Sequence, residues 1–194
     1  MKTYRLLYDS VIDFARAAVL VEEDIGRHDL RYDSDDAVQG LSGRKHHDMW
    51  VSMKAVSHFN LGTSLELLLK LLLVRSGGIA PSSHELARLH DALIETDRKE
   101  FESKYRASRR ESPKFALLMF NSPESEPPPD TRNINSLRGF LEYLDRDVMV
   151  SKKRYSWEHA RDGVWRYYLS DITVFVELID RVMKEIPRDW PEVQ

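Results

Sequence analysis

Hydrophobic residues recur at three- and four-residue steps along most of the chain, and this spacing predicts α-helices. A first amphipathic helix is expected from about Lys2 to Ile25. The second helix, expected from about Asp48 to Val74, is the most apolar, and its second half has almost no polar stripe. Because a helix that is apolar nearly all round has no face for water, we place it in the middle of a bundle.

Turn and capping signals divide the next part of the chain. Ser76-Gly77-Gly78 ends the second helix, since glycine adopts a positive φ at a helix end without strain. Ser82 and Glu85 have the spacing of a capping box, which predicts a third helix that includes Leu86 to Ile94 and returns antiparallel to the second. The segment Asp97 to Phe120 is expected to be helical in part.

Two more helices are expected in the last third of the chain. Asn135 or Ser136 caps a short helix that extends through Leu144. A stripe of apolar residues at steps of three and four predicts a final helix from Trp165 to Ile186, where Pro187 ends it. The chain has no alternating strand pattern, no repeat and no glycine-rich phosphate loop, so the fold class is all-α.

These elements predict a single domain over residues 1–194, built as an antiparallel, up-and-down helical bundle with extra helices and long loops. Its core spans about residues 48–186, and the helix of residues 1–25 packs on that core. Long connections are expected at residues 26–43 and at the proline-rich stretch 121–131, which no regular element tolerates.

Composition narrows the classes of function. The chain is 42% hydrophobic, which suffices for a core, and it has no cysteine, which excludes disulfides and thiolate metal sites. Its net charge of −3 does not match a protein that coats nucleic acid by bulk charge, so any such contact must come from a local patch. The longest apolar run, Leu65 to Val74, is too short to cross a bilayer. We expect a soluble, cytoplasmic protein.

Two strings on the second and third helices resemble the HEPN family, the "higher eukaryotes and prokaryotes nucleotide-binding" helical bundles. The first, HFNLGTSLELLLKLLLVRSG, contains an E-x-x-x-K element at Glu66 and Lys70. The second, SSHELARLHDAL, begins the next helix with a His–any–Leu pattern at His84 and Leu86. The fourth helix, the short one through Leu144, ends in a basic connection that contains Arg-Tyr, and the whole string LRGFLEYLDRDVMVSKKRYSW is also similar to this family. The resemblance covers most of residues 48–186.

The resemblance implies one of two kinds of function. Some HEPN proteins are metal-independent endoribonucleases with an Arg-x(4–6)-His motif at the start of the last helix, and they act as dimeric toxins or antiviral effectors. Others lack catalysis and serve as binding or assembly modules beside another defence protein. We therefore expect an RNA- or nucleotide-associated module of a prokaryotic defence, toxin–antitoxin or stress system. Its protein partner would be a second copy of the chain or a protein encoded nearby, and it would need no cofactor.

Arg154 and His159 satisfy the catalytic spacing in the string RYSWEH and are the candidate catalytic residues. Metal-free RNA cleavage needs a base, an acid and a cation for the phosphorane, which these two side chains and a symmetry-related copy supply. Because residues five apart on a helix point about 140° apart, Arg154 must precede the last helix and His159 must lie in its first turn. Tyr155 departs from the small polar residue that the family prefers after the arginine, and Arg-Tyr is typical of members without catalysis. The sequence leaves catalysis undecided.

A basic and aromatic segment surrounds this pair. The candidate RNA- or nucleotide-binding residues are Lys152, Lys153, Tyr155, Trp157, Arg161 and Arg166. In contacts with single-stranded RNA, cations bind phosphate and rings stack on bases. Trp165 and Tyr168 are assigned instead to the buried seam of the last helix.

Glu66 and Lys70 have two interpretations. The simpler one is a satisfied polar pair that fixes the register of the bundle, since buried pairs of this kind give specificity more often than stability. The alternative is buried acid–base chemistry. His84 is expected to be structural, and its alternative is an approach to the region of Arg154.

Other polar residues are expected to be structural. Residues 44–48 (RKHHD) read as the start of the second helix, because adjacent histidines seldom chelate one ion, and we expect no metal site. His58 and His90 are assigned to the interior of the bundle.

Two further hypotheses accompany the leading one. The first is an active metal-independent endoribonuclease that uses Arg154 and His159. The second is a structural interaction protein with no nucleic-acid role.

Overall fold

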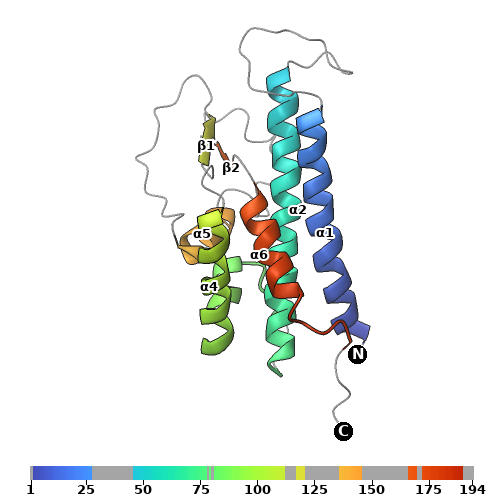
Figure 1. Ribbon diagram of the computed structural model, residues 1–194, viewed down its shortest axis with the longest axis vertical. Helices are drawn as coiled ribbons and strands as arrows, with labels where there is room; N and C mark the ends of the chain where they lie inside the picture. Colours follow the sequence, from blue (N-terminus) through green and yellow to red (C-terminus); the bar gives the residue numbers. More distant parts are fainter. Residues whose placement is uncertain are drawn as a thin grey trace.

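The computed structural model describes residues 2–27, 46–77, 79, 81–111, 117–120, 136–145, 166–169 and 172–189. Within these ranges the chain forms a helical bundle with one short two-stranded ribbon, which confirms the predicted all-α class (Figure 1). The helices are α1 (Lys2–Arg27), α2 (His46–Arg75), α3 (Leu86–Asp91), α4 (Glu95–Glu111), α5 (Leu137–Leu144) and α6 (Thr173–Met183). The ribbon consists of β1 (Leu117–Phe120) and β2 (Arg166–Leu169).

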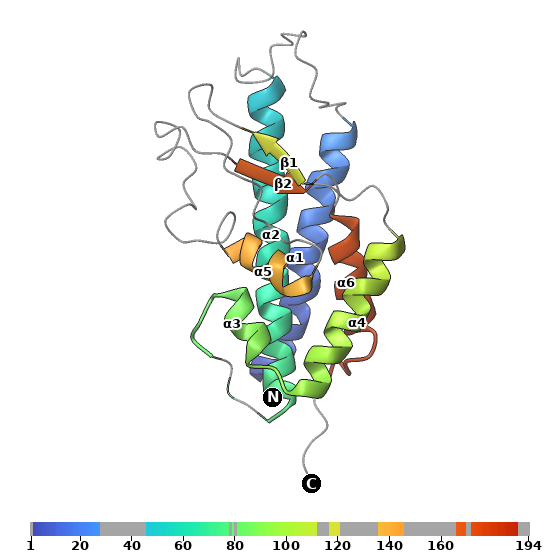
Figure 2. The same cartoon turned by 90° about the vertical axis from the view of Figure 1, so that its left-hand side faces the viewer.

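α2 is the central helix, as its apolar pattern predicts. Most of its leucines between Leu61 and Leu72 are buried, on several sides of the helix, and α1, α3 and α6 all pack against it (Figures 1 and 2). A central position gives this apolar helix cover from water.

α1 packs antiparallel along α2 through a seam with a seven-residue repeat. Tyr4, Val11, Ala18 and Ile25 are all buried and recur every seven residues, which keeps one face of α1 on its neighbour. The small side chain of Ala18 lets the helices approach closely. Ser57 Oγ therefore reaches and donates to the backbone carbonyl of Ala18 at 3.4 Å, and one heptad later Ser64 Oγ donates to that of Val11 at 2.7 Å.

The other half of the bundle is centred on three aromatic rings. Tyr105 from α4, Phe140 from α5 and Phe175 from α6 are buried together. The rings of Phe140 and Phe175 stack with centroids 3.6 Å apart, and Tyr105 lies 5.7 Å from Phe175. Burial raises the pKa of Tyr105 to about 12. One cluster thus joins three helices that are distant in the sequence.

The start of α3 differs from the predicted capping box. Ser82 is not the cap: the residue at the N-cap position is Glu85, whose side chain makes no capping hydrogen bond. Asp145, at the end of α5, accepts from the backbone N–H groups of Leu86 at 2.6 Å and Ala87 at 2.9 Å. The cap of α3 is therefore a carboxylate that lies 59 residues further along the chain, and no local sequence pattern could reveal it.

The third helix is also shorter than predicted. α3 ends at Asp91, and Leu93 and Ile94 lie in the turn to α4. The prediction that Asp97 to Phe120 is helical in part is confirmed, because α4 extends to Glu111. The predicted cap of the short helix is confirmed too: Ser136 Oγ accepts from the backbone N–H of Gly139 at 3.0 Å.

The ribbon corrects two predictions, the absence of strands and a final helix that begins at Trp165. β1 and β2 pair antiparallel, with Leu117 opposite Leu169 and Phe120 opposite Arg166, and the last helix begins only at Thr173. Runs as short as LLMF and RYYL fit a helix or a strand equally well. Their pairing, between segments far apart in the sequence, is what decides for the strand.

Replacing Asp145 with alanine tests the long-range cap. We expect Asp145→Ala to lower the free energy of unfolding by about 1–2 kcal/mol, because two backbone N–H groups of α3 lose their acceptor. Urea unfolding followed by circular dichroism measures the change. Ser82→Ala, at the position predicted from the sequence, is the matched control and should change stability by less than about 0.5 kcal/mol. Equal losses in the two variants would contradict this assignment of the cap.

Candidate functional site

Most of the residues proposed from the sequence for catalysis and RNA contact lie outside the described residues. These are Lys152, Lys153, Arg154, Tyr155, Trp157, His159 and Arg161. Arg166 is placed as the first residue of β2, opposite Phe120. One expectation about this region is wrong: the last helix begins at Thr173, so His159 is not in its first turn. Whether Arg154 and His159 lie near each other is a question outside the described residues.

The structure brings together a different group of polar residues: Glu66 and Lys70 of α2 and His84 before α3. Lys70 Nζ lies 2.8 Å from Glu66 Oε1, and His84 Nδ1 lies 2.9 Å from the same oxygen. A carboxylate oxygen can only accept, so Nδ1 of His84 carries the proton and donates. Glu66 is buried, whereas the side chain of His84 is 70% exposed. The carboxylate is thus satisfied from two sides at the edge of the bundle.

This contact confirms the interpretation of Glu66 and Lys70 as a satisfied polar pair, and it adds His84 as a third member. The chain reverses direction between α2 and α3 at Gly77, whose φ of 82° belongs to the left-handed region. That turn returns His84 alongside Glu66. The E-x-x-x-K and His–any–Leu patterns both signalled these residues, but their contact follows from the turn and could not be read from spacing.

The arrangement limits what the cluster can do. With Nδ1 held by Glu66, Nε2 is the nitrogen of His84 that is left to contact a solute. The ammonium of Lys70 is bound to the same carboxylate and is largely covered by protein. The cluster therefore offers one oriented, exposed imidazole at the α2–α3 turn, held in place by a buried acid.

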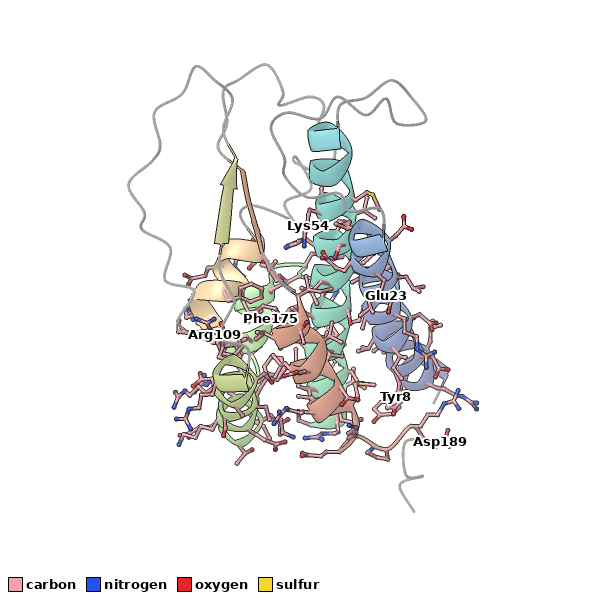
Figure 3. The ribbon with its side chains drawn as sticks, turned by 45° about the horizontal axis from the view of Figure 1, so that its top comes forward. Tyr8, Glu23, Lys54, Arg109, Phe175 and Asp189 are labelled. Atoms are coloured by element: carbon pink, nitrogen blue, oxygen red, sulfur yellow. The ribbon has the colours of Figure 1, made fainter. Side chains whose placement is uncertain are left out.

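A second polar group lies inside the α1–α2 seam. Lys54 lies in the upper part of α2 (Figure 3). It is buried and forms an ion pair with Glu22 of α1, whose side chain is partly buried. His58, one turn further on, is fully buried, and its Nδ1 donates to the backbone carbonyl of Lys54 at 2.6 Å. Burial lowers the pKa of His58 to about 3, and the nearby Lys54 charge adds to this effect. His58 is therefore neutral in the folded protein and structural, as the sequence predicts.

His90 is the other buried histidine of the described part of the chain. Its ring lies against Phe101, with centroids 6.3 Å apart, and neither ring nitrogen has a hydrogen-bond partner among the described residues. Burial lowers its pKa, while Glu102 and Asp91, each almost 4 Å away, act in the opposite direction. A neutral ring packed in the core agrees with the structural role predicted for it.

A groove of about 520 Å³ runs between α1 and α6 on the outside of the bundle. α1 lines it with a stripe from Tyr8 to Leu20, and α6 lines it with Val176, Ile179 and Met183. Tyr8 lies near the start of α1, on the side of the bundle where α6 ends (Figure 3). The sequence did not signal this groove, because it arises from the way in which two helices that both pack on α2 lie beside each other.

The described residues contain no group of three or more histidine, aspartate or glutamate side chains that could hold a metal ion. Among the same residues, no helix is long and apolar enough to cross a membrane. Comparison with models of protein families, with curated proteins and with solved structures finds no match to this chain.

The buried His58 predicts a dependence of stability on pH. Its pKa is about 3 when folded and 6.5 when exposed, so between these values the unfolded chain binds a proton that the folded chain does not. Stability contributed by the neutral ring is therefore lost as the pH falls below 6.5. Between about pH 7 and pH 5, urea unfolding should show the wild type losing about 2 kcal/mol more than His58→Asn.

His58→Asn is a suitable variant because its side-chain amide can donate to the Lys54 carbonyl in place of Nδ1. The quantity compared is the change in the free energy of unfolding between the two pH values, measured separately for each protein. Any loss of packing energy that the variant suffers equally at both pH values therefore cancels. Equal pH dependence in the two proteins would show that His58 is not the group responsible.

Proposed function

We propose that this chain is a HEPN-like helical module that associates with RNA or a nucleotide in a prokaryotic defence, toxin–antitoxin or stress system. The observation that carries the proposal is the contact of Glu66 with Lys70 and His84 on the central helix of a bundle. These are the residues on which the resemblance rests, and here they form one connected polar group. The function itself is assigned to the segment that leads into β2.

The segment from Lys152 to Arg161 supplies the chemistry for RNA contact. It combines cations, which bind phosphate, with Tyr155 and Trp157, whose rings can stack on unpaired bases. Because the whole chain has a net charge of −3, binding would depend on this local patch and would weaken steeply with salt.

Catalysis is a separate question within this proposal. Arg154 and His159 have the residue types that metal-free RNA cleavage needs. Their convergence cannot come from the first turn of α6, which begins at Thr173. An endoribonuclease would need these two residues to meet through another backbone geometry, or across a pair of molecules.

The groove between α1 and α6 favours a second candidate function, a protein-interaction module without a nucleic-acid role. Its lining is mainly apolar, and exposed apolar surface of this kind marks binding to another protein more often than to nucleic acid. The two functions predict different results in an RNA-binding measurement.

RNA binding is tested with a fluorescent single-stranded RNA at low salt. We expect the wild type to bind, and Lys152→Ala/Lys153→Ala to bind roughly tenfold more weakly because two phosphate contacts are lost. The matched control is Lys99→Ala/Arg106→Ala, which removes the same charge from exposed positions of α4 and should bind as the wild type does. Absence of binding by the wild type at about 50 mM salt would exclude the RNA hypothesis.

Cleavage is tested on the same RNA with EDTA present. An endoribonuclease should cleave under these conditions, and Arg154→Ala and His159→Ala should each reduce the rate by about 100-fold or more, because each removes a group that acts in the transition state. Binding without cleavage by the wild type would identify a non-catalytic module.

A further inference from the structure

We propose that the groove between α1 and α6 binds a free medium-chain carboxylate, a small molecule with one apolar chain and one anionic end. The alkyl chain lies against the apolar walls of the groove, and the carboxylate binds Arg16 at its rim. This inference does not depend on RNA binding. It is supported by the size of the groove, by its apolar walls and by the charges of its lining.

The groove has the size of a site for a small molecule. Its volume of about 520 Å³ falls within the range of roughly 300–1,000 Å³ that is usual for such sites. Its lining on α1 extends from Tyr8 to Leu20, which corresponds to about 18 Å along the helix axis. A stable protein interface buries about 800 Å² on each partner, which a strip of this length between two helices does not provide. A protein partner would therefore need contacts beyond the groove, whereas a small ligand fits inside it.

Aliphatic side chains form most of the walls. Those that α1 and α6 contribute are Ile12, Val19, Leu20, Val176, Ile179 and Met183. Leu20 is 60% exposed, so water covers part of this apolar surface. An alkyl chain that displaces this water gains free energy with every CH₂ group that it buries. The walls therefore favour a ligand with an apolar chain.

The charged side chains of the groove favour an anion. Asp180 is the one acidic residue among the described residues of the lining, and its Oδ2 lies 2.6 Å from Lys184 Nζ. Arg16 lines the same groove, is exposed and forms no ion pair with any described residue. With two cations and one anion, the lining attracts negative charge, and Arg16 is the cation that is available to bind it.

The position of Arg16 matches a molecule that carries its charge beside an apolar chain. A guanidinium binds a carboxylate through two parallel N–H···O bonds. Arg16 lies four residues from Ile12 and four from Leu20 on the lining face of α1, so an anion at Arg16 has an apolar wall next to it. A membrane would be bound by an apolar face that enters the lipid, whereas this surface is hollow. We therefore assign the groove to a free carboxylate.

The test is isothermal titration calorimetry of the full chain with decanoate, at concentrations where decanoate is monomeric and at about 0.15 M salt. We expect saturable binding. Decyltrimethylammonium is a cation with the same alkyl chain, and it should bind roughly tenfold more weakly because Arg16 repels it. Acetate has the charge without the chain and should show no binding, because it buries almost no apolar surface.

Arg16→Glu tests the charge at the rim. It should weaken the binding of decanoate roughly tenfold and strengthen that of decyltrimethylammonium, because the charge beside the alkyl chain is reversed. The matched control is Arg5→Glu, the same change at a side chain of α1 that is 59% exposed and lies outside the groove. Arg5 is about 16 Å from Arg16 along the helix, beyond the screening length of about 8 Å, so this control should bind both ligands as the wild type does.

Leu20→Glu tests the apolar wall. It places a carboxylate beside the alkyl chain and should weaken the binding of decanoate by roughly tenfold or more. Circular dichroism should show unchanged helix content, because Leu20 is already exposed. The matched control is Leu6→Glu, the same change at a residue of α1 that is 67% exposed and does not line the groove, and it should bind decanoate as the wild type does.

Each outcome supports or overturns the proposal. Absence of saturable decanoate binding would overturn it and leave the groove to a protein partner. Equal binding of the anion and the cation by the wild type, or binding that Leu20→Glu leaves unchanged, would overturn it as well. Sedimentation of the chain with phosphatidylglycerol vesicles, lost in the same variants, would replace the free ligand with a membrane surface. Decanoate binding that passes these tests in a chain that does not bind RNA would support this inference while the RNA hypothesis fails.

Discussion

The burial of the leucine-rich second half of α2 is the constraint from which the remaining structure follows. A helix whose second half is rich in leucine on several sides must be covered by several neighbours, and α1, α3 and α6 pack around it. Polar groups on such a helix must find partners in place, since an unpaired polar group in the core costs more than its hydrogen bond contributes. The hydroxyls of Ser57 and Ser64 meet this need on α1. In meeting it they also fix where α1 lies along α2.

The polar contacts around α2 thus set the register of its neighbours. The pair of Lys54 with Glu22 fixes the upper part of α1, and Glu66 fixes the turn that leads to α3 by binding His84. On the far side of α3, Asp145 binds the first backbone N–H groups of that helix and ties it to α5. Buried polar groups seldom add much net stability, but each of them is satisfied in one arrangement and not in its neighbours. These polar contacts therefore select one packing arrangement of an apolar core that could otherwise pack in several ways.

The functional proposals rest on two parts of the molecule, and these were identified by two independent kinds of observation. The segment from Lys152 to Arg161 was identified by its residue types, which are those that bind RNA. The groove between α1 and α6 was identified by its shape, and the residues that line it look in the sequence like ordinary core positions of two amphipathic helices.

The sequence by itself determined what depends on neighbouring residues. Periodicity placed α1 and α2 within a few residues of their ends, glycine ended α2, and Ser136 was identified as a cap because its acceptor reaches a backbone N–H only three residues away. The tertiary structure decided whatever joins distant segments. The ribbon, the cap from Asp145, the contact of His84 with Glu66 and the groove beside α1 all depend on elements brought together after the helices form. The spacing of a residue along the sequence determines which face of its helix it lies on. Which residue it contacts depends on how the whole bundle packs around α2.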